Sequence, residues 1–266
     1  MDLGLRGRVA LVCAASQGLG KAAARGFARE GAHVVICARQ RKPLMETARE
    51  IREAIGDQPV QVVPVVADLT SARNITAVVA RTMKTFGRID VLITNAGGPP
   101  VAPFDDLDDS KWEQGVALTL MSAVRCIRAV LPHMRKRQWG RIVNITSIAA
   151  KQPINDLVIS SALRPGILGL TRVLASQCGK DGILVNSVAP GFMLTSRMQQ
   201  IGQSRSKEQG ITVEEYFRKQ SSDIPLQRYG DPEELANVIV FLGSERASYV
   251  TGATVSVDGG MLKGLF

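Results

Sequence analysis

Short runs of consecutive apolar residues alternate along the chain with longer segments in which apolar residues recur at helical spacing. Nearly continuous apolar runs are typical of strands that are covered on both faces of a parallel sheet. They predict seven strands, at residues 9–13, 33–37, 60–66, 91–94, 141–146, 184–188 and 254–257. Helices are predicted near residues 19–30, 43–56, 71–86, 109–138, 157–179 and 231–242. This alternation predicts right-handed βαβ units in a single doubly wound α/β domain over residues 1–266.

The segment 192–228 interrupts the alternation. It is polar, contains two glycines and carries one predicted helix near residues 212–220. A connection this long inside a compact domain is usually functional. We predict a mobile flap over a substrate pocket, in which several apolar side chains favour an apolar or sizeable ligand. These side chains are Met193, Leu194, Met198, Ile201 and Phe217.

The composition supports a packed core, because 45% of the 266 residues are apolar and 21% are charged. No apolar run approaches the roughly 18 residues that a membrane span needs, and we find no signal-peptide pattern. The four cysteines lack the spacing of metal ligands or of a disulfide framework, which fits a reducing compartment. The sequence therefore predicts a cytoplasmic globular protein without a metal site or a membrane contact.

The formal net charge of +9 comes from basic residues spread along the chain, with one dense cluster. This cluster contains Arg135, Lys136, Arg137 and Arg141. We interpret it as a solvated helix end, with an acidic partner as the alternative. The chain lacks an aromatic and basic stacking platform, so no nucleic-acid partner is expected.

A glycine-containing turn lies between the first predicted strand and the first predicted helix. Glycines at this place let backbone N–H groups approach a pyrophosphate at a helix N-terminus, where the helix dipole favours negative charge. The turn therefore predicts a dinucleotide-binding site. Its contributing residues are Ala14, Ser16, Gln17, Gly18, Leu19 and Gly20.

Arg39 follows the second predicted strand, where proteins that prefer NAD place an acidic residue for the ribose 2′-hydroxyl. A guanidinium group suits a 2′-phosphate, and Arg41 and Lys42 add positive charge nearby. The sequence therefore favours NADP(H) over NAD(H).

From these features onward, the chain resembles the short-chain dehydrogenase/reductase family over essentially its whole length. Motifs of this family match the sequence in order, at residues 13–20, 67–70, 94–97, 190–191 and 257–260. The nearest likeness is to the 3-oxoacyl-carrier-protein reductase branch. The resemblance implies a Rossmann-type fold and a homotetramer or homodimer formed through helices 109–138 and 157–179. It also implies a cofactor site that includes Asp68, Leu69, Asn95, Ala96, Gly97, Arg164, Pro190 and Gly191.

Ala14 stands where the family's turn has its first glycine. Its methyl group is tolerated if the backbone keeps a negative φ, and costly if φ is positive. The expected cofactor is the same in either case.

The catalytic positions depart from the family's Asn–Ser–Tyr–Lys group. The resemblance places the serine at Ser147, but Ser160 stands at the tyrosine position, Arg164 at the lysine position and Thr119 at the asparagine position. An aliphatic hydroxyl is a far weaker acid than a phenol, and arginine keeps a charge without carrying protons. Loss of a positioned general acid typically lowers a rate about 10²–10⁴-fold.

Pro165 adds a backbone difference beside Arg164, because proline removes an N–H and disfavours helical geometry in the residue before it. We expect the helix to begin around residues 163–165, or to kink between Ser161 and Pro165.

Other groups are candidates for the missing proton donor. They are Tyr216 in the flap, Lys151 four residues after Ser147, and a water molecule held by Ser147 and Ser160. We interpret His33, His133, Tyr229 and Tyr249 as structural or packing residues.

The leading hypothesis is an NADP(H)-dependent oxidoreductase that transfers hydride between nicotinamide and a small-molecule carbonyl or secondary alcohol. Ser147 would orient the substrate oxygen, Ser160 would stand in the acid position directly or through water, and Arg164 would hold the ribose. The alternative hypothesis is an NADP(H)-binding protein with little or no redox activity, in a regulatory or assembly role. The substrate is not identified by the sequence beyond an apolar or acyl-type preference.

Overall fold

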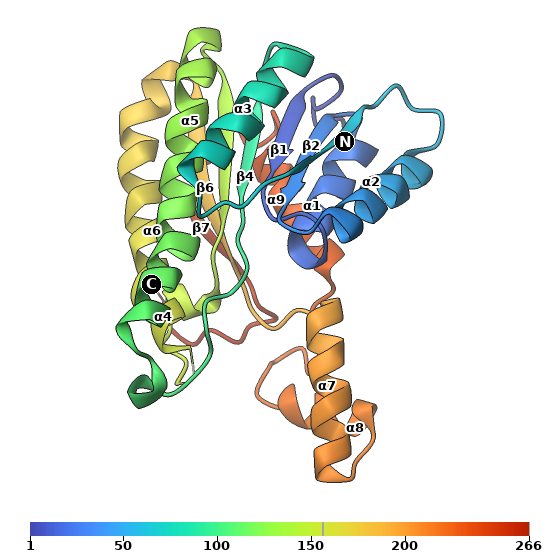
Figure 1. The fold of residues 1–266 in the computed structure, drawn as a ribbon, viewed down its shortest axis with the longest axis vertical. Helices are drawn as coiled ribbons and strands as arrows, with labels where there is room; N and C mark the ends of the chain where they lie inside the picture. Colours follow the sequence, from blue (N-terminus) through green and yellow to red (C-terminus); the bar gives the residue numbers. More distant parts are fainter. Residues whose placement is uncertain (156, 266) are drawn as a thin grey trace.

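Seven parallel strands form the centre of the molecule (Figure 1), in a computed structural model that describes residues 1–155 and 157–265. The strand order is β3-β2-β1-β4-β5-β6-β7, which confirms the predicted doubly wound sheet. The strands are β1 (Val9–Val12), β2 (His33–Ala38), β3 (Val62–Val66), β4 (Val91–Thr94), β5 (Gly140–Ile145), β6 (Ile183–Pro190) and β7 (Thr254–Val257).

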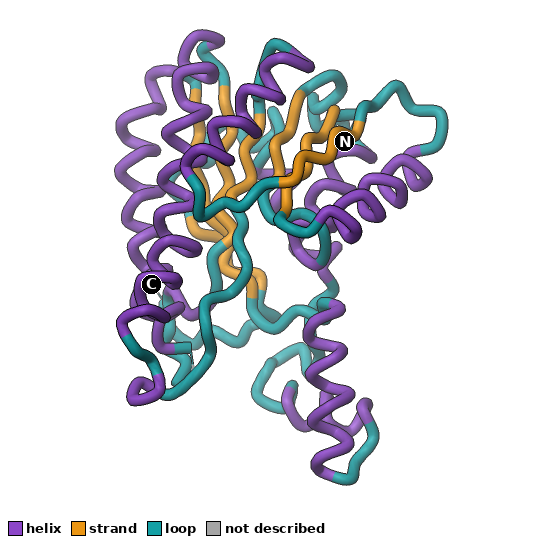
Figure 2. The backbone as a smooth tube through the Cα atoms, viewed as in Figure 1, coloured by secondary structure: helices purple, strands orange, loops and turns teal. Residues whose placement is uncertain are grey.

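Helices cover both faces of this sheet, as the tube in Figure 2 shows. Neighbouring residues of a strand point to opposite faces, so Leu11 and Val12 belong to different apolar clusters. The cluster around Val12 is completed by α1 (Gly18–Arg29), α2 (Arg41–Ile55) and α9 (Pro232–Leu242). The cluster around Leu11 is completed chiefly by α3 (Ala72–Phe86), α5 (Ser122–Arg137) and α6 (Val158–Cys178).

Two helical stretches, 109–137 and 158–181, are long and apolar enough to cross a membrane by length and composition alone. The expectation that no segment would reach this threshold was therefore wrong. Both stretches contribute buried side chains to the protein core, among them Ile127, Val130 and Ile167. The core helices of α/β domains meet the same criterion, so these two stretches are not evidence of a membrane span.

The predicted helix 109–138 is divided into three parts. A short helix α4 (Asp109–Gly115) passes into a π-helical turn (Val116–Met121), and α5 continues to Arg137. Such π-turns inside helices frequently mark functional sites. Here the turn carries Thr119, the residue at the family's asparagine position.

Helix α6 begins at Val158, in agreement with the helix predicted at residues 157–179, and the expectation that Pro165 would delay its start to residues 163–165 was wrong. The Ser161 N–H donates to the Leu157 carbonyl at 2.7 Å, so the first turn is closed before the proline is reached. Pro165 is exposed inside the helix, where it removes one intrahelical hydrogen bond and leaves the helical assignment continuous.

The flap contains two helices, α7 (Ser196–Gln209) and α8 (Val213–Gln220), which project beyond the sheet (Figure 1). The helix α8 was predicted, and α7 was not. Phe217 lies edge-on to Tyr229 at a 5.2 Å centroid distance and packs against Gly202 of α7, where a Cβ would come 2.4 Å from its ring. The flap therefore has an aromatic core of its own.

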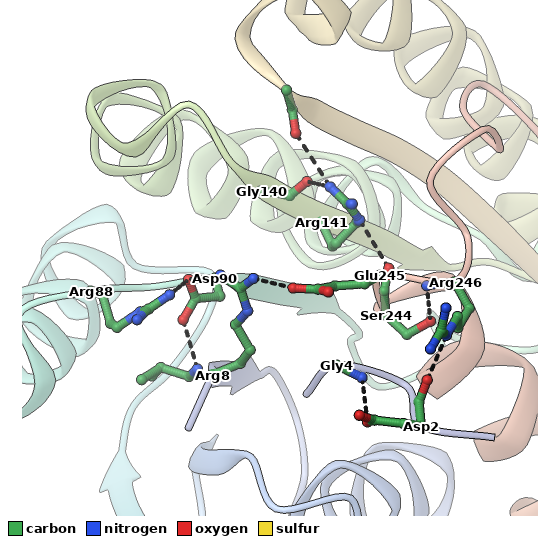
Figure 3. Close-up of polar contacts among 12 residues, drawn as sticks. Asp2, Gly4, Arg8, Arg88, Asp90, Gly140, Arg141, Ser244, Glu245 and Arg246 are labelled. Carbon is green, nitrogen blue, oxygen red and sulfur yellow. Dashed lines mark hydrogen bonds and ion pairs between the residues drawn. The ribbon is translucent and has the colours of Figure 1, made fainter. Parts of the chain in front are cut away.

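A network of charges ties the loops together at the amino ends of the strands (Figure 3). Asp90 is fully buried, accepts from the Val9 N–H at 2.8 Å and pairs with Arg88 and Arg8 at 2.5 and 3.6 Å. Arg8 also pairs with Glu245. Arg8, Arg88, Asp90 and Glu245 therefore each have a partner of opposite charge at the amino ends of the strands.

Arg141 belongs to the same edge, although the sequence placed it in a solvated basic cluster. It is 5% exposed and donates to the carbonyls of Ser244, Gly140 and Gly182 at 3.1, 2.9 and 3.3 Å. Its guanidinium also lies over the Trp139 ring at 4.4 Å. The prediction of a solvated Arg141 was therefore wrong, because these acceptors and the indole hold it inside.

Candidate active site

A cleft of about 640 Å³ opens at the carboxyl ends of the central strands. It lies where the strand order reverses between β1 and β4, the usual position of ligands in doubly wound sheets. Eleven of the predicted cofactor residues line it. They are Ala14, Ser16, Gln17, Gly18, Leu19, Arg39, Asp68, Leu69, Asn95, Ala96 and Gly97.

The glycine-containing turn closes one end of this cleft. Gln17 precedes α1 without a side-chain cap, so the first N–H groups of the helix are not satisfied by a capping side chain. Ala14 has a φ of +46°, the costly conformation that its methyl group was expected to make unfavourable. Gly20 lies directly behind it, since a Cβ there would come 2.6 Å from the Ala14 carbonyl oxygen. The turn therefore combines unpartnered donors with backbone strain.

Asp68 and Arg39 lie on the wall of the cleft that follows β2 and β3. The Thr70 backbone N–H and hydroxyl donate to Asp68 Oδ1 at 2.9 and 2.8 Å, which holds the pKa of this carboxyl below its usual value. The charge of Arg39 acts in the same direction. Arg39 is exposed and forms no ion pair among the described residues, so its guanidinium is available to an anionic ligand.

The flap contributes residues to the cleft that the sequence reasoning missed. Thr195, Ser196 and Arg197 line it at the start of α7, and Thr195 lies 3.4 Å from where a Cβ of Gly18 would be. Thr195 caps α7 by accepting from the Met198 N–H. A threonine ahead of a helix start was the available signal. Further wall residues outside the prediction are Ala38, Gln40, Ala67 and Leu118.

Four predicted cofactor residues, Gly20, Arg164, Pro190 and Gly191, do not line the large cleft. Gly191 packs against the main chain of Asp258, 2.8 Å from the position of an added Cβ. The lack of a side chain at Gly191 therefore allows the segments around Gly191 and Asp258 to pack closely together.

Ser160 and Arg164 form a pair on the first two turns of α6. Arg164 Nε donates to Ser160 Oγ at 2.8 Å, and its Nη1 donates to the Thr146 carbonyl at 2.7 Å. Burial lowers the pKa of the Arg164 guanidinium to about 10. Ser160 itself is buried, 4% exposed. The guanidinium is thus folded inward onto the end of β5.

Ser147 follows Thr146 directly, so the Thr146–Arg164 hydrogen bond brings this segment and α6 together. Ser147 Oγ accepts from the Ala149 N–H at 3.1 Å, at the start of a short 3₁₀ turn (Ile148–Ala150). The oxygens of Ser147 and Ser160 each accept one hydrogen bond, so each hydroxyl proton is left without an acceptor among the described residues. Neither serine lines the large cleft or the small niche beside it.

Thr119 faces a separate small niche rather than the large cleft. The niche has a volume of about 10 Å³ and shares Asn95 and Ala96 with the wall of the cleft. Arg164 also lines it, so the structure brings together the residues at the family's asparagine and lysine positions. The Thr119 hydroxyl is buried without a hydrogen-bond partner among the described residues.

The other candidate proton donors lie elsewhere or in unfavourable surroundings. Tyr216 is buried in the flap, edge-on to Phe217. Burial raises the pKa of Tyr229 to about 12. Tyr249 is fully exposed, so its interpretation as a packing residue was wrong. Lys151 is exposed after the 3₁₀ turn.

The sheet order, the cleft and the turn define a dinucleotide-binding protein of the Rossmann class. The chain matches, over residues 13–262, the family model described as enoyl-(acyl carrier protein) reductase. It is 36% identical over 260 residues to a putative ketoacyl reductase of the monensin polyketide synthase from Streptomyces virginiae, covering 96% of this chain and 97% of that protein. The chain belongs to the short-chain dehydrogenase/reductase family.

Solved structures agree with this assignment. The fold superposes with a TM-score of 0.95 on L-sorbose reductase from Gluconobacter frateurii in complex with NADPH and L-sorbose, with 38% identity and complete coverage of both chains. It also superposes, with a TM-score of 0.88, 28% identity and 97% coverage of both chains, on an NADPH-bound short-chain oxidoreductase from Pseudomonas aeruginosa PAO1. That structure is described as containing an atypical catalytic center.

Proposed function

We propose that this protein is an NADP(H)-dependent carbonyl reductase or alcohol dehydrogenase with a non-standard proton donor. The observation that carries the proposal is the Ser160–Arg164 pair at the end of β5, next to Ser147 and behind the wall of a dinucleotide cleft. When bound, the nicotinamide cofactor supplies or accepts the hydride. The residues of the chain then have to bind the substrate oxygen and manage its proton.

The two serines are suited to hydrogen bonding at the substrate oxygen. Ser147 would orient this oxygen through its hydroxyl, while Ser160 would pass its proton toward the oxygen directly or through a water molecule. The cation of Arg164 on Ser160 Oγ favours release of that proton, because it stabilises the resulting negative charge. Arg164 is thereby a positioning and electrostatic residue, and holding the ribose would require a different orientation of its side chain.

NADP(H) fits the cleft residues. Arg39 offers an unpaired guanidinium after β2, and the turn at 14–20 offers backbone donors at a helix N-terminus. We expect Arg39→Ala to weaken NADPH binding roughly 10–100-fold, the effect of one or two charge-assisted hydrogen bonds. NADH binding should change little, and fluorescence titration with both cofactors measures the difference. Equal losses for the two cofactors would contradict the assignment of Arg39 to the 2′-phosphate.

Turnover is tested by following NADPH absorbance at 340 nm with a panel of ketones, including sugar ketones and 3-oxoacyl thioesters. The informative variant is Ser160→Tyr with Arg164→Lys, and its matched control is Ser160→Phe with Arg164→Lys, which adds the ring without the hydroxyl. We expect measurable turnover by the unmodified protein and a rise of about 10²–10⁴-fold in kcat for the tyrosine variant only. If the unmodified protein binds NADPH and turns over no substrate of the panel that the tyrosine variant reduces, it is a cofactor-binding protein instead.

We also propose that the protein assembles as a homotetramer or homodimer through the helices 109–137 and 158–178. Val173 of α6 is 52% exposed, and Met121 and Leu168 on the same helices are half-buried. Apolar side chains on two neighbouring helices are suited to burial against a second copy. Sedimentation at micromolar concentration would show a mass of two or four chains, and a monomer would contradict the proposal.

A further inference from the structure

The niche beside the cleft wall is lined by three hydroxyl groups, those of Thr94, Thr119 and Ser122. Two of the three donate hydrogen bonds to other residues of the protein. Thr94 donates to Asn144 at 2.6 Å, and Ser122 donates to the Leu118 carbonyl at 2.5 Å. Thr119 is 4% exposed, and its buried hydroxyl has no hydrogen-bond partner among the described residues. A buried polar group left in this way costs about 1–3 kcal/mol, so the niche favours a ligand that accepts a hydrogen bond.

The niche also has an excess of positive charge. Arg164 lines it, and its guanidinium uses Nε and Nη1 for Ser160 and main-chain carbonyls. Its Nη2 forms no hydrogen bond and the side chain forms no ion pair within residues 1–155 and 157–265. The other residues of the niche are uncharged, namely Thr94, Asn95, Ala96, Thr119, Ser122, Ala123, Ile145 and Ile167.

The size of the niche limits its ligand to one atom or a very small molecule. A volume of about 10 Å³ corresponds to a single water-sized probe. A water molecule would accept from Thr119 but leave the charge of Arg164 unbalanced in a partly desolvated place. A monatomic anion satisfies the hydroxyl and the guanidinium together, and its attraction to the cation is strengthened where water is excluded.

We propose that the niche is a binding site for a single monatomic anion of the chloride type. The anion accepts from the Thr119 hydroxyl and from Arg164, with the methyl groups of Ala96, Ala123 and Ile167 among its apolar surroundings. Its binding stabilises the folded protein by mass action. Because the anion offsets the charge of Arg164 that favours proton release from Ser160, it would lower any turnover that depends on this serine.

The first experiment uses bromide as the probe. Crystals of the unmodified protein grown with sodium bromide should show an anomalous bromine peak between Thr119 and Arg164. Titration followed by ³⁵Cl NMR should show saturable line broadening that bromide displaces. A peak at the niche without bromine signal, which indicates water only, would overturn the proposal.

The second experiment compares thermal unfolding in sodium chloride and sodium gluconate at constant ionic strength, which separates binding from screening of the +9 charge. At a chloride concentration ten times Kd, the ratio of folded to unfolded protein should rise about elevenfold over gluconate. Thr119→Val removes the free hydroxyl at nearly constant volume and should reduce this chloride effect at least severalfold.

Ser122→Ala is the matched control, because Ser122 lines the same niche but its hydroxyl is already engaged. It should keep the chloride response of the unmodified protein. Equal chloride responses in the unmodified protein and in Thr119→Val would contradict the site. If a variant fails to fold, the bromide crystal and the NMR titration on the unmodified protein still decide.

Discussion

Arg141 is buried and Arg164 is partly buried, at opposite ends of the strands of the same sheet. Burial lowers the pKa of each guanidinium to about 10, and each donates to main-chain carbonyls. Neither arginine forms an ion pair among the described residues, but Arg141 lies over Trp139 and is acted on by the charges of Arg8 and Glu245, whereas burial alone acts on Arg164. Arg141 therefore belongs to a structural network of charges at the amino ends of the strands, while Arg164 has no charged neighbour of that kind at the carboxyl ends.

The largest expected effect comes from breaking the amino edge. Asp90→Ala leaves Arg88 and the Val9 N–H without their buried acceptor, so the free energy of unfolding should fall by about 3–5 kcal/mol. Urea unfolding measures this. The control is Glu53→Ala, which removes an exposed pair with Arg49 and should cost less than about 0.5 kcal/mol. Similar losses in the two variants would contradict the special role of the charge network at the amino ends.

The second prediction compares the two arginines directly in chloride-free buffer. Arg141→Met should lower the free energy of unfolding by roughly 2–4 kcal/mol, because three carbonyls and the indole lose their partner. Arg164→Met should lower it less, by about 1–2 kcal/mol, since the partly buried Arg164 loses two short hydrogen bonds, to Ser160 and to the Thr146 carbonyl. Equal effects in urea unfolding would mean that the two arginines do not differ in their structural role.

The smallest effect concerns the backbone of the carboxyl edge. Ala14→Gly should raise the free energy of unfolding by about 0.5–1 kcal/mol, because a glycine adopts the φ of +46° without strain. Ala15→Gly is the control, and it should lower stability because Ala15 is fully buried and its φ is not positive. Thermal unfolding distinguishes the two signs, and a loss in both variants would show that Ala14 is unstrained.

Much of the fold was predictable because the strands carry an unmistakable apolar pattern. The predicted strand 254–257 agrees with β7 residue for residue, and the helix predicted at residues 231–242 agrees with α9 to within one residue. The helix α7 was missed because it has few apolar residues to reveal a helical period. The sequence predicted the turn at residues 14–20, but the sign of φ at Ala14 is known only from the structure.

The candidate site was predictable in its residues and less so in its geometry. The sequence identified Ser160 and Arg164 as departures from the family, and the structure places them in hydrogen-bond contact. The direction of the guanidinium depends on the Thr146 carbonyl, which lies in another element and leaves no mark on the local sequence. The niche around Thr119 likewise depends on packing among four separate segments.

The contact between Gly202 and Phe217 determines which residues position 202 can accept. The Phe217 ring packs directly against the backbone of Gly202, so a larger residue there would push α7 away from α8 without contacting a strand of the sheet. Such a substitution should loosen the packing of the two flap helices, while the apolar clusters on the two faces of the sheet, to which residue 202 does not belong, keep their contacts.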